Sequence, residues 1–335
     1  MRGDKRMSKL KAIQIGLGGF GLSWVELLQA NQNMELVAIV DQQEESLQKA
    51  QEMTNLGPEQ LFISFEKALE KVQADFVLIV TPPATHIALA KQALKAGLHV
   101  MMEKPLTDTA EEANDLLAFS REYSQKVMVS QNYRWNPQIQ TIKQLIAASS
   151  IGPIEYADYY FNKATHFGGW RDQYEEILLQ DMAIHHFDIL RYLLNDEAVT
   201  IQATSFRPSW SWFKGNPHAD AAMTFSKGVH VNYRGRWAGK GKKTTWNGDI
   251  RLVGERGAIE LIDDQVLLYQ GEQDTPEEIP LIKTPASDRM ISLDSFIQAI
   301  KEDTVPPTSI EDNIKSLQLT WAAIESSKTG ERVHL

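Results

Sequence analysis

Residues 16–21 read Gly-Leu-Gly-Gly-Phe-Gly and lie between an apolar run at 11–15 and a helical segment at 20–30. A second apolar run at 36–40 ends at Asp41, twenty residues beyond the last glycine. Strand, glycine turn, helix and acid in this order form the fingerprint of a dinucleotide-binding fold. The glycines permit a tight turn and the close approach of a pyrophosphate, which the helix N-terminus attracts. We expect a nicotinamide or flavin dinucleotide, with a ligand-free glycine turn as the alternative, and the predicted contacts are Gly16, Gly18, Gly19, Phe20 and Gly21.

Asp41 indicates which dinucleotide is bound. A carboxylate at the end of the second strand accepts hydrogen bonds from the ribose hydroxyls of the adenosine half, and it repels a 2′-phosphate. Gln42 and Gln43 follow, so the next residues supply no Arg or Lys to hold that phosphate. The sequence therefore favours NAD over NADP. Alternatively, Asp41 caps a helix that begins near Glu44, and such a cap is compatible with ribose binding.

The composition is that of a soluble globular protein long enough for two domains, with 335 residues of which 43% are hydrophobic and 23% charged. The formal net charge of −10 argues against nucleic acid or an anionic membrane surface as a partner. The absence of Cys excludes disulfides and thiolate chemistry and fits a cytoplasmic protein. No apolar run reaches the roughly 20 residues that span a bilayer. We treat residues 1–8 as a flexible leader without the apolar stretch of a signal peptide.

Residues 9–131 alternate between helical stretches and short apolar runs at 11–15, 36–40, 76–80, 98–102 and 127–129. This alternation predicts an α/β domain, a Rossmann doubly wound parallel sheet with helices on both faces. From 132 to 335 the pattern changes. It consists of an apolar helix at 175–194, strands between 197 and 270 joined by short turns, and closing helices at 288–302 and 309–328. These residues predict an α+β domain with a large, mainly antiparallel open sheet.

The helix at 175–194 is apolar over most of its surface, yet it carries Asp181, His185 and Asp188 at i, i+4 and i+7. These positions share one stripe of an α-helix, and buried polar groups are costly unless they bind each other, a ligand or water. One interpretation is structural, with Asp181 bonded to His185 and Asp188 paired with Arg191. A metal site is another, but no third ligand and no HExxH pattern are present, so we expect no metal. Catalysis is the third interpretation.

Two predicted strands of the parallel sheet are followed by polar segments, Thr81-Pro82-Pro83 and Glu103-Lys104-Pro105. Ligands of such sheets bind at the carboxyl ends of the strands, so the nicotinamide end of the dinucleotide should arrive near Lys104. A lysine there can hydrogen-bond a reacting hydroxyl and stabilise the developing alkoxide. An ordinary solvated lysine is the alternative.

The glycine segment at 16–21, Thr81-Pro-Pro-x-x-His86, Glu103-Lys104-Pro105 and Asp181-x-x-x-His185 occur in this order along the chain. In this respect the sequence resembles the glucose–fructose oxidoreductase, inositol dehydrogenase and rhizopine catabolism (Gfo/Idh/MocA) family, over nearly its whole length. The resemblance implies that Lys104, Asp181 and His185 are catalytic. The histidine would take the proton of a sugar or polyol hydroxyl while the carbon gives a hydride to the nicotinamide, the lysine would polarise the oxygen, and the aspartate would bind the substrate or orient the histidine.

The resemblance also implies further cofactor contacts, and we expect them at Thr81, Pro82, His86, Glu103 and Lys104. For His86, a plain position at a helix start is an equally good interpretation. Two residues depart from the family pattern: Ala183 stands where Gly is common, and Thr81 where Asn is common. His186 points about 100° away from His185 around a helix, so we do not expect it to be the base.

Substrate contacts are the least specified part of the sequence. The candidates flank the motif helix or open the second domain, and they are Arg134, Tyr160, Asn162, His166, Trp170 and Arg171. We expect an NAD-dependent dehydrogenase of a sugar, cyclitol or related polyol, with its site between the domains. Because family members usually pack their open sheets together, we expect a homodimer or homotetramer through the C-terminal sheet. A non-catalytic dinucleotide-sensing regulator, or a reductase of a dihydrodiol, biliverdin or imine, are the alternatives.

Overall fold

The computed structural model describes residues 9–335 apart from the side chain of Trp170, so the predicted leader at 1–8 lies outside the described residues. The chain divides into two compact units. The first contains the residues up to Gln131 together with Arg289–Ile314, and the second contains Asn132–Asp288 and Lys315–Leu335. The sequence predicted a single second domain from 132 to the end, so the return of residues 289–314 to the first unit is a difference.

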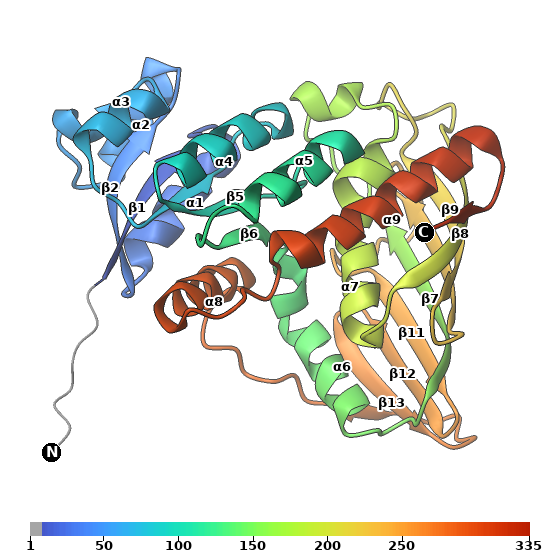
Figure 1. Ribbon diagram of the computed structural model, residues 1–335. Helices are drawn as coiled ribbons and strands as arrows, with labels where there is room; N and C mark the ends of the chain where they lie inside the picture. Colours follow the sequence, from blue (N-terminus) through green and yellow to red (C-terminus); the bar gives the residue numbers. More distant parts are fainter. Residues whose placement is uncertain (1–8) are drawn as a thin grey trace, which may run out of the picture. The chain divides into compact units, whose positions relative to one another are not determined.

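The first unit is built on a parallel six-stranded sheet in the order β3-β2-β1-β4-β5-β6. Figure 1 labels β1, β2, β5 and β6 of this sheet. Each strand pairs in parallel with its neighbours in this order, as the alternation of strands and helices predicts. Its elements are β1 (Leu10–Ile15), α1 (Gly19–Ala30), β2 (Met34–Val40), α2 (Glu44–Glu52), β3 (Leu61–Phe62), α3 (Phe65–Lys71), β4 (Phe76–Ile79), α4 (His86–Lys95), β5 (His99–Glu103), α5 (Ala110–Ser120) and β6 (Val127–Ser130). The α/β fold class and the Rossmann topology are confirmed.

Helix α8 (Asp288–Glu302) returns to this unit because it carries an apolar face that the sheet buries. Leu293, Phe296 and Ile297 are at most 2% exposed and belong to the same core cluster as the strands. The ring of Phe296 meets that of Phe76 on β4 edge to face, with 5.6 Å between the ring centres. Apolar burial of three such side chains explains why this segment packs on the first unit although it lies far beyond Gln131 in the sequence.

The second unit is built on a nine-stranded sheet in the order β14-β13-β12-β11-β7-β10-β9-β8-β15. Its elements are α6 (Pro137–Ala147), β7 (Ile154–Asn162), α7 (Ile184–Leu194), β8 (Ala198–Phe206), β9 (His218–Phe225), β10 (His230–Arg236), β11 (Asp249–Gly254), β12 (Gly257–Ile262), β13 (Gln265–Gln270), β14 (Glu277–Ile279) and β15 (Val333–His334). Helix α9 (Ile310–Thr329) contains the boundary between the units after Ile314. The sheet is antiparallel except for the pair β7 and β10, which is parallel.

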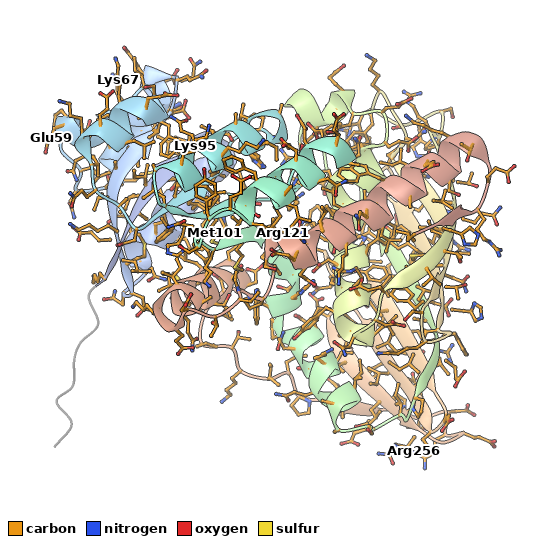
Figure 2. The ribbon with its side chains drawn as sticks, in the orientation of Figure 1. Glu59, Lys67, Lys95, Met101, Arg121 and Arg256 are labelled. Carbon is orange, nitrogen blue, oxygen red and sulfur yellow. The ribbon has the colours of Figure 1, made fainter. Side chains whose placement is uncertain are left out.

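Burial alternates along the strands of this second sheet. On β7, Tyr159 and Phe161 are buried against the helices, whereas Tyr156 and Tyr160 point to the opposite face and are exposed. In the first unit, Lys95 at the end of α4 is exposed, whereas Met101 on β5 is buried in the core. Both residues are labelled in Figure 2. Among residues 9–335, no helix is both long and apolar enough to cross a membrane.

Candidate functional site

The glycine segment forms the turn between β1 and α1. Gly16 has φ +92°, and a Cβ there would lie 2.5 Å from the carbonyl oxygen of Val80 and 2.9 Å from the nitrogen of Thr81. A Cβ on Gly21 would overlap the carbonyl oxygen of Gly16. The buried amide of Gln14 donates to the carbonyls of Gly16 and Gly21, at 3.1 and 2.8 Å. Gly16 and Gly21 are therefore required by the packing of the turn itself.

Gly18 and Gly19 are different, because a Cβ on either would have no atom within 4 Å. The internal packing of the chain does not require glycine at these two positions. Gly18 is also the N-cap of α1 and supplies no side chain to cap the first N–H groups, and no acidic residue lies in the first turn. By contrast, α5 is capped by the Thr109 hydroxyl, which accepts from the Glu112 N–H. The first N–H groups of α1 have no side-chain cap, and the glycines before them leave space for a ligand. Such a helix N-terminus is suited to binding a pyrophosphate.

Asp41 lies at the end of β2 and binds the glycine segment directly. Its Oδ2 accepts the Leu17 N–H at 2.7 Å, and its Oδ1 accepts the Gln43 N–H at 2.9 Å. The N-cap of α2 is Gln43, so Asp41 is not the cap that the sequence offered as an alternative. Each oxygen of an ionised carboxylate has a second lone pair, so these bonds leave Asp41 able to accept from ribose hydroxyls.

His86 links the two polar segments that follow β4 and β5. Its Nε2 lies 2.9 Å from the carbonyl oxygen of Thr81 and its Nδ1 lies 3.0 Å from that of Pro105. The ring is completely buried, and this burial lowers its pKa. Pro82 precedes the short helical turn that leads into α4. Both neighbours are carbonyl acceptors, and a neutral imidazole has one N–H donor, so His86 donates to one of these carbonyls and packs against the other. The buried ring supports the segments of Thr81 and Lys104 from within and offers no surface to a ligand.

Glu103 is the last residue of β5 and is almost completely buried. Its Oε1 accepts the indole N–H of Trp24 on α1 at 2.8 Å, and its Oε2 accepts the backbone N–H of Lys104 at 3.2 Å. Burial raises the pKa of Glu103, and the nearby Lys104 charge opposes the rise. One carboxylate oxygen therefore anchors Glu103 to α1, and the other holds the backbone of Lys104. Lys104 is half-buried beside a cis peptide bond to Pro105.

The motif of the second unit does not lie on a regular α-helix. Residues Leu178–Ala183 form a π-helical turn, and α7 begins only at Ile184. The expected stripe assumed 3.6 residues per turn throughout, and the wider π turn breaks that spacing between Asp181 and His185. Asp181 lies in the π turn, is 5% exposed, and accepts a hydrogen bond from Arg171 Nε at 3.0 Å. π turns occur frequently at functional sites.

The ring of His185 stacks on the ring of Tyr133, with 4.2 Å between their centres and 19° between their planes. Burial raises the pKa of Tyr133, so this residue stays protonated. His186 is surrounded by Tyr159, Phe161 and Tyr233, and burial lowers its pKa to about 3. His186 is therefore a neutral core residue, whereas the stacked ring of His185 has its orientation fixed by Tyr133.

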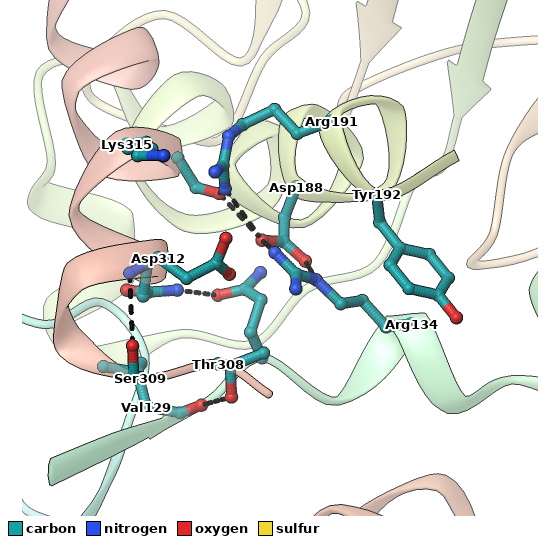
Figure 3. Close-up of polar contacts among 12 residues, drawn as sticks. Val129, Arg134, Asp188, Arg191, Tyr192, Thr308, Ser309, Asp312 and Lys315 are labelled. Carbon is teal, nitrogen blue, oxygen red and sulfur yellow. Dashed lines mark hydrogen bonds and ion pairs between the residues drawn. The ribbon is translucent and has the colours of Figure 1, made fainter. Parts of the chain in front are cut away.

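Asp188 belongs to a buried ion-pair network (Figure 3). Arg134 donates to both of its carboxylate oxygens at 2.7 Å, through Nε and a terminal nitrogen. Arg191 lies 3.6 Å from Asp188, and Ser316 Oγ donates to it at 2.7 Å. The pairing of Asp188 with Arg191 was expected, but the bidentate partner is Arg134. Arg134, a candidate substrate contact, is therefore occupied in the interior of the unit.

The other substrate candidates are dispersed over the second unit. Tyr160 points to the sheet face opposite the one that α7 covers, because the neighbouring Tyr159 contacts His186. Asn162 is buried and donates to the carbonyls of Lys240 and Lys242. The ring of His166 stacks on Trp212 at 3.7 Å. Arg171 is the candidate that contacts the motif, through Asp181, and the side chain of Trp170 lies outside the described residues.

No group of three or more His, Cys, Asp or Glu in the described part of the chain could hold a metal ion. No pattern in the sequence predicted the positions of Tyr133, which stacks on His185, or of Trp24, which donates to Glu103. Both contacts join residues that are more than 50 positions apart, so no local pattern signals them.

Fold and site together define the class of protein. The first unit has a six-stranded Rossmann sheet, an uncapped glycine turn and an acid after β2, and the second unit has a mixed sheet. This combination is typical of dinucleotide-dependent oxidoreductases. Residues 10–131 match the family model of oxidoreductases with an NAD-binding Rossmann fold, and residues 139–260 match that of the Gfo/Idh/MocA C-terminal domain. The chain belongs to the Gfo/Idh/MocA family, as its motifs indicated, and its first unit is an NAD-binding Rossmann domain.

Known proteins resemble the chain over nearly its whole length. A D-apiose dehydrogenase from Paraburkholderia graminis is 27% identical over 346 residues, which cover 98% of this chain and 90% of the relative. An oxidoreductase from Agrobacterium radiobacter, solved with NAD+, L-tartaric acid and magnesium, has a TM-score of 0.90 at 22% identity and covers 98% of both chains. An aldose-aldose oxidoreductase from Caulobacter crescentus, solved with glycerol, has a TM-score of 0.87 at 19% identity, over 98% of this chain and all of that one. These two structures share the fold.

Proposed function

We propose that this protein is an NAD-dependent dehydrogenase that oxidises a hydroxyl carbon of a sugar, cyclitol or related polyol. The observation that carries the proposal is the buried His185, whose ring is fixed by stacking on Tyr133 and lies next to a π turn that presents the Arg171–Asp181 ion pair. Membership of the oxidoreductase family supports it, and so does the name of the D-apiose dehydrogenase relative.

The proposed chemistry assigns one task to each side chain. When bound, NAD accepts the hydride from the carbon that bears the hydroxyl. His185 takes the hydroxyl proton, because an imidazole is the side chain suited to proton transfer near neutral pH. Lys104 stabilises the developing negative charge on the oxygen as a cation. Asp181, whose charge is balanced by Arg171, accepts a hydrogen bond from a second hydroxyl of the substrate or from the ring of His185.

The residues of the first unit fit the cofactor. The open Gly18 and Gly19 positions and the uncapped start of α1 suit the pyrophosphate, and the remaining lone pairs of Asp41 suit the adenosine ribose. Glu103 holds the backbone of Lys104 in place rather than contacting the cofactor itself. We propose that Asp41 selects NAD over NADP, because a carboxylate repels a 2′-phosphate.

The experiment replaces Lys104 and His185, singly and together. Lys104→Met and His185→Ala are each expected to lower kcat by roughly 100-fold to 10,000-fold and to leave the Kd for NAD within about two-fold. If both act on one substrate, the double variant loses little more than the worse single variant. Exposed residues of the same types, in Lys67→Met and His230→Ala, are the matched controls and should keep full activity.

Full turnover in either site variant would refute the assignment. Multiplicative losses in the double variant would show that the two residues act independently, against the proposal of a shared substrate. Tight NAD binding without turnover of any sugar or polyol would instead favour the alternative of a dinucleotide-sensing protein.

A further inference from the structure

Arg289 is the first residue of the segment that returns to the first unit. Its position is fixed by contacts a few residues further along α8. The carboxylate of Asp294 accepts hydrogen bonds from the side-chain amides of Asn31 and Asn33, both at 2.9 Å, just beyond the end of α1. The amide of Asn31 also contacts the sulfur of Met290 at 3.1 Å. The start of α8 is therefore held along α1 with Arg289 pointing toward the glycine turn.

The guanidinium of Arg289 lies against the first two turns of α1. It is 5.1 Å from the ring centre of Phe20 and 5.3 Å from that of Trp24, and a terminal nitrogen donates to Ser23 Oγ at 2.8 Å. The side chain of Phe20 is 51% exposed and is the second residue of the helix. Residues 16–21 contain no charged side chain. Arg289 therefore supplies a positive charge next to the glycine turn, at the start of α1.

Within residues 9–335, Arg289 is held by the hydroxyl of Ser23 and by two aromatic rings rather than by a carboxylate. Arg289 forms no ion pair among residues 9–335, and the acids nearest to it in sequence are engaged elsewhere. Asp288 accepts a hydrogen bond from Asn132, and Asp294 binds the two asparagines of the α1 end. A cation beside the positive N-terminal end of a helix is electrostatically unfavourable, unless an anion lies between them. The arrangement therefore favours a bound anion at this helix N-terminus, and the glycine turn belongs to an NAD-binding domain.

The neighbours of Arg289 also indicate which part of the dinucleotide it meets. Trp24, whose ring centre lies 5.3 Å from the guanidinium, donates to Glu103 at the end of β5. Asp41, at the end of β2, instead accepts the backbone N–H of Leu17 in the glycine turn. In a sheet of this order the adenosine half lies over β2, so the nicotinamide half extends toward β4 and β5. Arg289 is on the β5 side, where the phosphate that carries the nicotinamide ribose is expected.

We propose that Arg289 binds the pyrophosphate of NAD, at the phosphate on the nicotinamide side. The guanidinium can donate to phosphate oxygens in pairs, while the rings of Phe20 and Trp24 hold its plane in place. The anion receives donors from two segments far apart in the sequence, the N–H groups of α1 and the side chain of Arg289. This proposal rests on the NAD-binding fold and not on the oxidation of any sugar.

The test measures binding by isothermal titration calorimetry, without a second substrate, for NAD, ADP-ribose and AMP. Arg289→Gln is expected to weaken NAD and ADP-ribose about equally, by roughly ten-fold, because a charge-assisted hydrogen bond is lost. AMP lacks the second phosphate and should bind within about two-fold of the wild-type affinity. Arg289→Lys should restore part of the loss, and the dependence of the NAD Kd on salt should be weaker in Arg289→Gln. Arg121→Gln, an exposed arginine at the end of α5, is the control.

An unchanged Kd for ADP-ribose in Arg289→Gln would overturn the proposal. An equal loss for AMP would also overturn it, since it would show that the variant distorts the glycine turn. If Arg289→Gln does not fold, the comparison rests on Arg289→Lys, which keeps the charge but not the paired donors and should weaken ADP-ribose more than AMP. Wild-type protein that binds NAD but oxidises no polyol would contradict the proposed function and leave this inference standing.

Discussion

Replacing Gly16 with alanine should lower the stability of the protein, whereas replacing Gly18 with alanine should lower its affinity for NAD. The two glycines lie two residues apart in the same turn, yet their surroundings are opposite. A methyl group on Gly16 meets the Val80 carbonyl at 2.5 Å at a φ of +92°, whereas one on Gly18 meets no atom within 4 Å at a φ of −60°. The same chemical change is therefore forbidden by the fold at one position and tolerated at the other.

The expected magnitudes follow from these distances. Gly16→Ala combines left-handed strain of about 1–2 kcal/mol with overpacking of about 1–3 kcal/mol, so we expect a loss of roughly 2–5 kcal/mol. In units of this size about 1 kcal/mol corresponds to 2–4 °C, which gives a fall in Tm of roughly 4–20 °C. Gly18→Ala should leave Tm nearly unchanged, because the gain of about 0.4–1 kcal/mol from unfolded-state entropy is offset by the poorer fit of alanine at the N-cap of α1. Its methyl group would occupy the approach of the pyrophosphate, so the Kd for NAD should rise by at least about ten-fold.

The assay is differential scanning fluorimetry without ligand, followed by calorimetric titration of NAD into each variant that folds. Gly97→Ala serves as a control for left-handed strain alone, since Gly97 has φ +78° and a methyl group there would have no atom within 4 Å. It should lose less stability than Gly16→Ala and retain NAD affinity. The reasoning is refuted if Gly18→Ala binds NAD as tightly as the wild type, or if it loses as much stability as Gly16→Ala.

Three further predictions concern the interior and the cofactor preference. Asp188→Ala should cost about 3–5 kcal/mol, because it leaves the buried Arg134 without its carboxylate, and thermal denaturation equal to that of the exposed control Asp274→Ala would contradict this. His186 has its pKa lowered to about 3, so the unfolded chain binds its proton first and stability falls as pH drops from about 6.5 toward 3. In His186→Asn the free energy of unfolding should therefore fall less steeply on acidification, by at most about 1.4 kcal/mol per pH unit, as measured by denaturation at a series of pH values. An unchanged slope would count against the buried neutral ring. Asp41→Asn should narrow the ratio of NAD to NADP affinity by roughly ten-fold in parallel titrations, and an unaltered ratio would remove Asp41 as the selector.

Local patterns were sufficient for five of the six strands of the first unit. The glycine segment, the acid after the second strand and the alternation of apolar runs with helices are all short-range signals, and they predicted a Rossmann sheet. Helix α8 was predicted as an element at its observed bounds, 288–302. Its assignment to the first unit could not be predicted, because Phe296 meets Phe76 only in the folded chain. Strand β3, with two residues, is too short for a periodic signal.

The site shows the same limit more sharply. The sequence predicted Asp181 and His185 as site residues, but on one face of a regular α-helix. No pattern in residues 178–183 indicates the π turn that the structure contains. It proposed Arg134 and Tyr160 as substrate contacts from their positions near the motif, although one is bound to Asp188 and the other faces away from α7. Tyr133 and Arg289 were missed because their contacts with His185 and with α1 depend on tertiary structure.

The most direct test of the central claim is the formation of NADH from NAD with a panel of aldoses, sugar acids, inositols and other polyols, followed by absorbance, with NADP in parallel. The account predicts stereoselective turnover with NAD, weaker turnover with NADP, and loss of the signal in Lys104→Met and His185→Ala. Turnover that survives both substitutions, or that occurs with NADP alone, would contradict it.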